Sequence, residues 1–181
     1  MRLFASPIPN LNLVLMLAVS GVCAEEFQPS EYQLKAAFLF NFAKFVEWPA
    51  GAFPEAKSPM IIGVLGDNPF GAELERTIRD KTVNGRPLQI KEYRSLSEAR
   101  ACHILFVSNS EKKRLAEVFE GLRGTSVLTV GETEDFIESG GIISFVRESN
   151  KIHFQINDRA ARSAGLKISS KLLNLASQRA R

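Results

Sequence analysis

The sequence is poor in the residues from which catalytic and metal sites are usually built. It has two cysteines, two histidines and one tryptophan among 181 residues. Cys23 and Cys102 are too few for a disulfide framework or for a zinc site made of thiolates. His103 and His153 are flanked by apolar residues of strand type, with no carboxylate or cysteine at ligand spacing. We therefore expect no metal, no cofactor and no catalytic residue.

A strong charge of either sign is also missing. The chain has 23 basic and 20 acidic residues, which gives a formal net charge of +3. A nucleic-acid partner requires clustered cationic surface, so the composition offers no case for one. Acidic residues gather in one segment, which we interpret as a solvated face, with contact to a basic partner as the alternative; they are Glu132, Glu134, Asp135 and Glu138.

The apolar run Leu11–Val19 is too short to span a bilayer, which takes about 20 residues. It follows the positively charged Arg2 and precedes the segment Val22-Cys23-Ala24, which has the position of a signal-peptide cleavage region. This order is typical of a secretory signal cut after Ala24, with an uncleaved anchor or a buried helix as the alternative. Lipidation at Cys23 is disfavoured, because bulky Val22 stands where a lipoprotein signal has a small residue. We expect residues 1–24 to be removed and a single domain, residues 25–181, to work in the periplasm.

Export narrows the classes of function that are open to the chain. ATP and reduced nicotinamide are scarce outside the cytoplasm, and replication or transcription takes place elsewhere. Removal of Arg2 and of no acid lowers the net charge from +3 to +2. Binding, sensing, envelope work, hydrolysis and redox chemistry remain.

Short apolar runs alternate with helical patterns through the middle of the chain. The predicted strands are Met60–Leu65, Pro87–Ile90, Cys102–Val107 and Ser126–Val130. The predicted helices are Pro69–Asp80 with Asp67 or Asn68 as its cap, Leu96–Arg100, and one capped by Ser110. Strands without polar alternation indicate a parallel sheet that is covered on both faces. The fold class is therefore α/β, with an open three-layer sheet of mainly parallel strands and helices on both faces.

The two ends of the domain carry different patterns. Ser30 and Gln33 have capping-box spacing, which predicts a helix over Glu31–Glu47 that Trp48-Pro49 ends. Near the other end, we predict a C-terminal antiparallel hairpin at the edge of the sheet, formed by Ile142–Val146 and Lys151–Asn157. Two helices follow it, Asp158–Ala164 and one capped by Ser169, with Leu172, Leu173 and Leu175 facing inward.

Four residues are candidates for contact with a partner. Phe40, Lys44 and Trp48 belong to the first helix or follow it, and Phe40 lies off the main apolar arc. A core helix with one stray aromatic is the alternative. Arg159 opens a helix, where a cation is poorly placed relative to the dipole, so that it is either kept for a contact or simply tolerated at the surface.

Three residues are candidates for contact with a small molecule. Asp67 and Asn68 lie in the glycine-rich turn Gly63–Gly71, which joins a strand to a helix and could hold an anion with backbone amides. A tight turn with a helix cap is the alternative. Asn157 stands where the last long strand stops and a helix begins.

Taken together, three parts of the chain resemble one family. The chain is similar to YfiR-like proteins in its first helix, in one strand with its turn, and in its closing segments. These are Tyr32–Pro49, Ile62–Gly71, and then Gly140–Phe145, Ile152–Asn157 and Ala164–Leu173. This resemblance implies a periplasmic regulator without catalysis. Such proteins bind the extracytoplasmic sensor region of an inner-membrane diguanylate cyclase and hold it inactive, and release raises cyclic di-GMP and favours biofilm growth.

The resemblance leaves the mode of control open. The best-studied members carry cysteine pairs tied to redox control, whereas the mature chain keeps only Cys102. A small ligand or competing partners would then have to replace an internal disulfide switch. The alternatives are a sensor kinase as the partner and a periplasmic small-molecule sensor or carrier. Self-association as a homodimer stays open, and an enzyme is the least favoured hypothesis.

Overall fold

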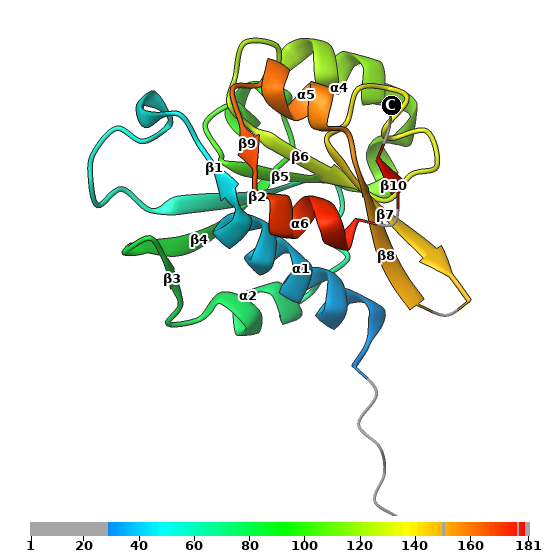
Figure 1. The fold of residues 1–181 in the computed structure, drawn as a ribbon, viewed down its shortest axis with the longest axis horizontal. Helices are drawn as coiled ribbons and strands as arrows, with labels where there is room; N and C mark the ends of the chain where they lie inside the picture. Colours follow the sequence, from blue (N-terminus) through cyan, green and yellow to red (C-terminus); the bar gives the residue numbers. More distant parts are fainter. Residues whose placement is uncertain (1–28, 150, 177, 180–181) are drawn as a thin grey trace, which may run out of the picture.

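The computed structural model describes residues 29–149, 151–176 and 178–179. The expected signal sequence 1–24, with its cut after Ala24, lies outside these residues. The described part is built around one mixed sheet with helices on both faces (Figure 1). The α/β prediction is confirmed.

The sheet has the strand order β10-β8-β7-β6-β5-β2-β4-β3. Its strands are β2 (Met60–Leu65), β3 (Thr82–Val83), β4 (Arg86–Tyr93), β5 (Ile104–Val107), β6 (Leu128–Gly131), β7 (Ile143–Glu148), β8 (Lys151–Ile156) and β10 (Gln178–Arg179). Neighbours from β4 through β7 pair in parallel, and the strand order reverses between β2 and β5. The predicted hairpin is the antiparallel pair β7–β8, beyond which short β10 adds in parallel.

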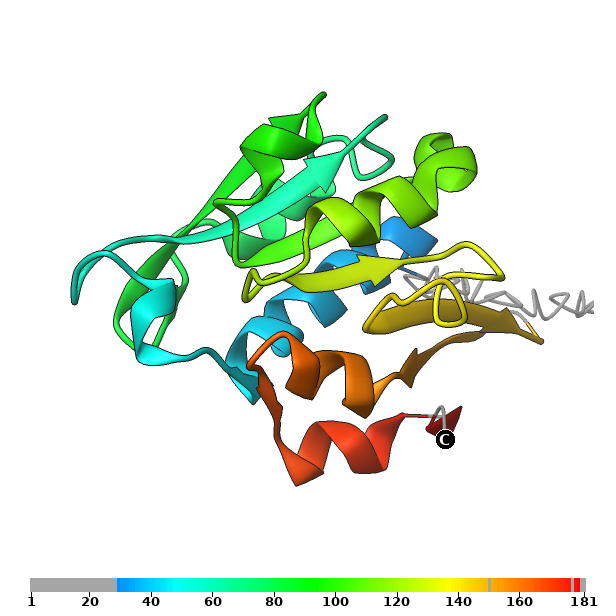
Figure 2. The same ribbon diagram turned by 90° about the horizontal axis from the view of Figure 1, so that it is seen from above.

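Helices cover the two faces of this sheet. They are α1 (Glu31–Phe45), α2 (Glu73–Ile78), α3 (Leu96–Ala99), α4 (Leu115–Gly121), α5 (Asp158–Ser163) and α6 (Ser170–Leu175), with 3-10 turns η1 (Ala50–Ala52) and η2 (Asn109–Arg114). α1, α2 and α6 share a buried cluster with one face, and α3 and α4 share a second cluster with the other. Figure 2 shows α4 and α6 on opposite sides of the sheet.

α1 begins and ends for local reasons. Ser30 Oγ accepts from the Gln33 amide at 3.3 Å while Gln33 Oε1 accepts from the Ser30 amide at 2.8 Å, which confirms the capping box. Buried Phe42 packs against Phe154 with ring centroids 5.2 Å apart. Burying one such side chain contributes about 1.5–3 kcal/mol. The helix stops two residues before the predicted end, because Val46 and Glu47 form β1, which pairs with β9 (Lys167–Ile168).

The helix predicted over Pro69–Asp80 is shorter than expected. Only α2 is helical, because Gly71 takes φ +53°, in the left-handed region, and interrupts the segment. The prediction that Asp67 or Asn68 caps this helix is wrong, since Ala72 occupies the N-cap. Asn68 Oδ1 instead accepts from the Phe70 amide at 2.9 Å and closes a local turn.

Two further local predictions are wrong. Ser108, not Ser110, caps the segment after β5, because a 3-10 turn begins at Asn109 before α4 starts. Ser169 does cap α6, but Leu175 is 68 % exposed rather than facing inward. α6 ends at Leu175, so this residue is the last of a short helix in which only Leu172 is buried.

Candidate functional site

The place where a parallel sheet usually binds ligands is closed here. That place lies beyond the carboxyl ends of the strands where their order reverses, between β2 and β5. The Gly66 amide donates to Tyr93 O at 3.2 Å, and the Asp67 amide donates to Ser110 Oγ at 3.0 Å. A Cβ at Gly66 would lie 2.3 Å from Ser110 Oγ, so the segment after β5 fills the crevice. These amides of the predicted Asp67–Asn68 ligand turn are thus bonded within the chain.

A buried network of charges lies further along the same edge of the sheet. Lys35 of α1 is only 3 % exposed, and its Nζ bonds Glu132 and lies 2.5 Å from Glu31 Oε1. Glu132 Oε1 also accepts from the Tyr32 hydroxyl at 3.3 Å and from Asn109 Nδ2 at 3.0 Å. Burial opposes the charge on Lys35, but the bonds to both carboxylates outweigh it and raise the lysine pKa. Burial, and then Glu132, raise the pKa of Tyr32.

The Lys35 network ties α1 to the end of β6, and the sequence prediction missed it. Glu132 follows β6 and its side chain is 7 % exposed, so the interpretation of this residue as part of a solvated face is wrong. The four-residue spacing of Glu31 and Lys35 is a signal for an ion pair on a helix. The decisive partner, Glu132, stands 97 positions away in the sequence.

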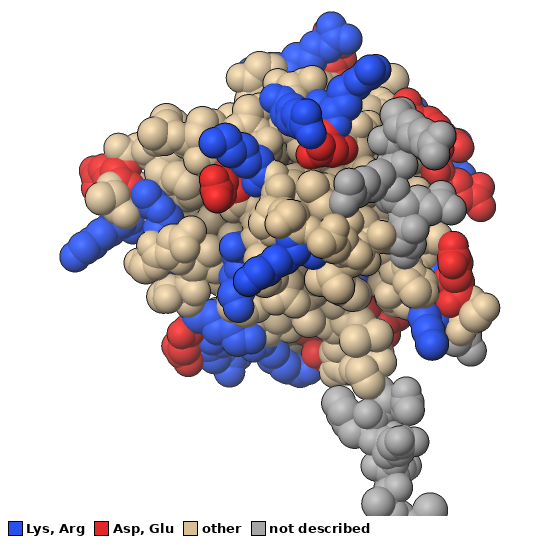
Figure 3. Space-filling model, viewed as in Figure 1, with Lys and Arg blue, Asp and Glu red and all other residues tan. Residues whose placement is uncertain are grey.

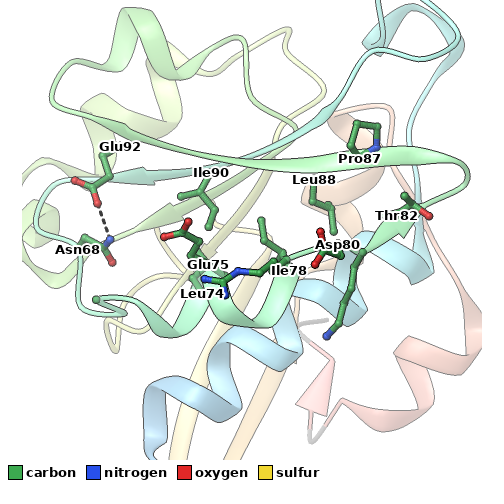
Figure 4. A pocket seen from close by; sticks show the side chains of 13 residues that line it. Asn68, Leu74, Glu75, Ile78, Asp80, Thr82, Pro87, Leu88, Ile90 and Glu92 are labelled. Atoms are coloured by element: carbon green, nitrogen blue, oxygen red, sulfur yellow. Dashed lines mark hydrogen bonds between the residues drawn. The ribbon is translucent and has the colours of Figure 1, made fainter.

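A groove of about 660 Å³ runs between α2 and β4 (Figure 4). Its middle is apolar on both walls, with contributions from Leu74, Ile78, Leu88 and Ile90. At one end, Asn68 Nδ2 donates to Glu92 Oε1 at 2.7 Å, and Glu75 lies nearby (Figure 4). Lys81 lines the groove as well. The structure therefore places one predicted ligand residue, Asn68, on the rim of an amphipathic groove.

Two lysines face one aromatic ring beside this groove. Lys44 Nζ lies 5.5 Å and Lys81 Nζ 4.6 Å from the centroid of the Phe40 ring. Within the part of the chain that the structure describes, neither lysine has a carboxylate partner within 4.0 Å. Basic side chains gather over α2 in the lower left of the space-filling view (Figure 3). The predicted partner residues Phe40 and Lys44 thus lie together, next to a lysine that the sequence analysis did not single out.

Trp48 lies apart from that pair and is turned toward the protein. Its Nε1 donates to the His103 carbonyl at 3.3 Å, and the two rings meet edge to face at 6.4 Å. His103 Nδ1 accepts from the Ile61 amide at 3.0 Å, and its Nε2 donates to Ala52 O at 3.1 Å, which fixes the neutral tautomer. Its ring stacks on Phe53 at 4.3 Å. Burial lowers the pKa of His103.

A second hollow brings together the last two predicted residues. It has a volume of about 540 Å³ and lies between α4 and α5, with Asn157 and Arg159 among its lining residues. Asn157 Oδ1 accepts from the Ala160 amide at 3.0 Å and so caps α5. Arg159 is exposed and makes no ion pair with any described residue. This hollow is separate from the groove between α2 and β4, so the predicted residues fall into different places.

Two absences apply to residues 29–149, 151–176 and 178–179. No three His, Cys, Asp or Glu side chains among them are grouped so that they could hold a metal ion. Within the same residues, no helix is both long and apolar enough to cross a membrane. Cys102 is buried, as expected, and burial raises its pKa to about 12.

Comparisons with known proteins give a family and a fold. A family model described as YfiR/HmsC-like matches residues 32–177. The search of curated proteins found no match. A conserved domain protein from Vibrio cholerae O1 biovar eltor is similar in structure, with a TM-score of 0.55 and 14% sequence identity over 84% of this chain and 61% of that chain. An ABC domain from Streptococcus pneumonia, solved in complex with L-Trp, aligns over 67% of this chain and 55% of its own, with 15% identity and a TM-score of 0.49. This chain therefore spans little more than half of either solved protein.

Proposed function

The chain belongs to the YfiR/HmsC-like family, and from this membership we propose that it is a non-catalytic periplasmic regulator. It binds the extracytoplasmic sensor region of an inner-membrane diguanylate cyclase and represses the enzyme, which limits cyclic di-GMP and biofilm formation. The observation that carries this proposal is the family match over nearly the whole described domain, residues 32–177. A sensor kinase with a similar extracytoplasmic region is the alternative partner.

Repression of this kind needs only differential binding. The regulator shifts its partner toward the inactive conformation by as much as it binds that conformation more tightly. The surface that we assign to this contact consists of Phe40, Lys44 and Lys81 with the adjoining groove between α2 and β4. Aromatic side chains are enriched at protein interfaces, and the two lysines beside Phe40 offer positive charge to an acidic surface of a partner.

The first test is capture of the partner. Tagged mature chain, residues 25–181, is incubated with detergent-solubilised inner membranes of the organism that makes it, and bound proteins are identified by mass spectrometry. We expect a cyclase or kinase with an extracytoplasmic sensor region, and weaker capture by the double variant Phe40→Ser/Lys81→Gln. The matched control is Lys113→Gln in η2, an exposed lysine that lines neither the groove nor the hollow. Failure of the wild-type chain to capture such a protein would count against the proposal.

The second test addresses repression and location. Deletion of the gene should raise cellular cyclic di-GMP, measured by mass spectrometry, and the full chain should restore the low level. A version without residues 1–24 should be made but should not restore it, because it stays in the cytoplasm. Equal complementation by both versions would contradict a periplasmic site of action.

A small-molecule sensor is the second candidate function, and the hollow between α4 and α5 favours it. Arg159 has no acidic partner among the described residues and lines this hollow of about 540 Å³ with Asn157. A small anionic metabolite is the ligand class that these side chains suit. Thermal-shift screening of wild type against Arg159→Gln tests it, since stabilisation should be lost in the variant. The two functions are compatible if the ligand controls partner binding.

A further inference from the structure

One side of β4 is left open along most of its length. β2 pairs with it from Met60↔Leu88 to Leu65↔Tyr93 on the inner side. On the outer side β3 reaches only Arg86 and Pro87. From Leu88 to Tyr93, no described strand lies against the outer side of β4.

The backbone groups that point away from the sheet can be identified. The Gly66 amide donates to Tyr93 O, which places the amide and carbonyl of Tyr93 toward β2 in the parallel register. Because the direction alternates along a strand, those of Leu88, Ile90 and Glu92 point outward. The antiparallel pair Thr82↔Pro87, next to Val83↔Arg86, directs the Leu88 amide at the Lys81 carbonyl. Within the described residues, no backbone group outside the sheet bonds the outward amides of Ile90 and Glu92.

Natural proteins usually protect such an edge. Charged side chains, proline, short strands, bulges or a covering segment are the common devices. Here β3 covers only the start of β4. Beyond it, the exposed side chains of Lys91 and Glu92 oppose indiscriminate pairing but do not cover the backbone. The segment Leu88–Tyr93 contains no proline, and it offers a strand-forming partner the outward amides of Ile90 and Glu92 and the outward carbonyls of Leu88, Ile90 and Glu92.

The same three residues border the groove. Leu88 and Ile90 point from β4 toward α2, and Glu92 lies at the Asn68 end (Figure 4). A strand added beside β4 would therefore direct every second side chain toward the groove. Leu74 and Ile78 of α2 form the opposite wall, so an aliphatic side chain fits its middle.

The charges around the groove define the rest of the occupant. Glu75 and Glu92 lie at the Asn68 end and form no ion pair with a described residue. Arg79 and Lys81 follow α2 together with exposed Asp80, and Lys44 and Lys81 both lie close to the Phe40 ring. A segment of complementary charge carries a basic residue that faces Glu75 and Glu92, and an acidic residue that faces Lys44 and Lys81.

We propose that the open edge of β4 binds an extended segment of the partner protein as an added strand, with an aliphatic side chain in the groove between α2 and β4. The segment carries an acidic residue near Lys81 and a basic residue near Glu75. This inference deepens the proposed function and rests on it for the identity of the partner. Strand addition of this type takes affinity from main-chain bonds and specificity from alternate side chains.

A peptide selection tests the edge without knowledge of the partner. A displayed library of random decapeptides is selected on the mature chain, and enriched peptides are bound to it for residue-resolved amide exchange. We expect enriched sequences with the charge order above, and new protection at the Ile90 and Glu92 amides but not at Gln89 or Lys91, which already bond β2. Failure to enrich such peptides, or protection that does not follow this alternation, overturns the proposal.

A single substitution then tests the full complex. Ile90→Pro removes an amide that the sheet does not use, so the fold should persist while peptide binding becomes about tenfold weaker. Gln89→Ala, whose side chain is on the other face, is the control. If Ile90→Pro is misfolded by circular dichroism, Ile90→Lys replaces it, since a charge in the apolar groove also opposes docking.

The outcomes separate this inference from the proposed function. Capture of a cyclase by wild type and equally by folded Ile90→Pro retains the proposed function and overturns edge binding. Absence of capture by wild type overturns the proposed function, while the peptide exchange pattern still decides on the edge. Light scattering completes the test, because a homodimer that Ile90→Pro dissociates would make a second copy of this chain the occupant instead.

Discussion

The two halves of α1 carry one lysine each into opposite surroundings. Lys35, near the start of the helix, is buried and bonded to two carboxylates, whereas Lys44, near its end, is exposed and faces only aromatic rings. Within the described residues, the fold pairs the first charge with two carboxylates and gives the second no acidic partner. A buried ion network holds elements in place, while an unpaired exposed cation is available to another molecule. The comparison separates the part of the helix that builds the domain from the part that we assign to its partner.

The comparison is tested most strongly by removing the buried lysine. Lys35→Met leaves Glu132 buried without its cation, and we expect a loss of about 3–5 kcal/mol in the free energy of unfolding, measured in urea. Adding Glu132→Gln should restore part of this loss, because the amide is neutral and still accepts from Tyr32 and Asn109. If Lys35→Met were no more destabilising than Lys44→Met, the assigned difference between the two lysines would be wrong.

A smaller change in the free energy of unfolding is expected from titration of His103. This second buried polar side chain is hydrogen-bonded at both ring nitrogens. Burial lowers its pKa, so the folded protein keeps the ring neutral while the unfolded chain protonates near pH 6.5. The stability that this residue contributes is present above that pH and is lost as the pH falls through it toward the folded pKa. Urea unfolding at a series of pH values between 7.5 and 5 should show this slope in wild type and a shallower one in His103→Gln. Equal slopes would contradict the assignment.

The smallest effect on stability is expected from changes near the C-terminal end of α1, where Lys44 is exposed. Lys44→Gln/Lys81→Gln removes two exposed cations from the Phe40 ring, and we expect a change within about 0.5 kcal/mol in the free energy of unfolding. Capture of the membrane partner should nevertheless fall, while Lys113→Gln should leave it unchanged. Strong destabilisation by the double variant would show that these lysines serve the fold instead.

Much of the fold could be predicted from local patterns. The capping box of Ser30 and Gln33 located the start of α1, and uninterrupted apolar runs such as Met60–Leu65 indicated buried parallel strands. The patterns failed where backbone geometry interrupted them, as at Gly71, whose positive φ shortened α2. They failed again at the end of α6, where Leu175 continues the apolar spacing but is 68 % exposed.

The candidate site was less accessible to prediction. Phe40 and Lys44 could be singled out because they share one helix, but Lys81 joins them only through the packing of α1 against α2. The closure of the predicted ligand turn depends on Ser110, which lies 43 positions from Asp67. Such pairings are tertiary, and no spacing in a single sequence reports them. The open side of β4 likewise follows from strand order, which composition does not determine.

The surroundings of Trp48 give the protein an internal optical reporter. This indole is the single tryptophan of the chain, and it bonds the backbone of His103 and meets its ring edge to face. A protonated imidazole quenches indole emission on contact, whereas a neutral one does so weakly. Fluorescence at a single excitation wavelength therefore distinguishes titration of the histidine, seen as dimming at constant emission colour, from exposure of the indole to water, seen as a red shift.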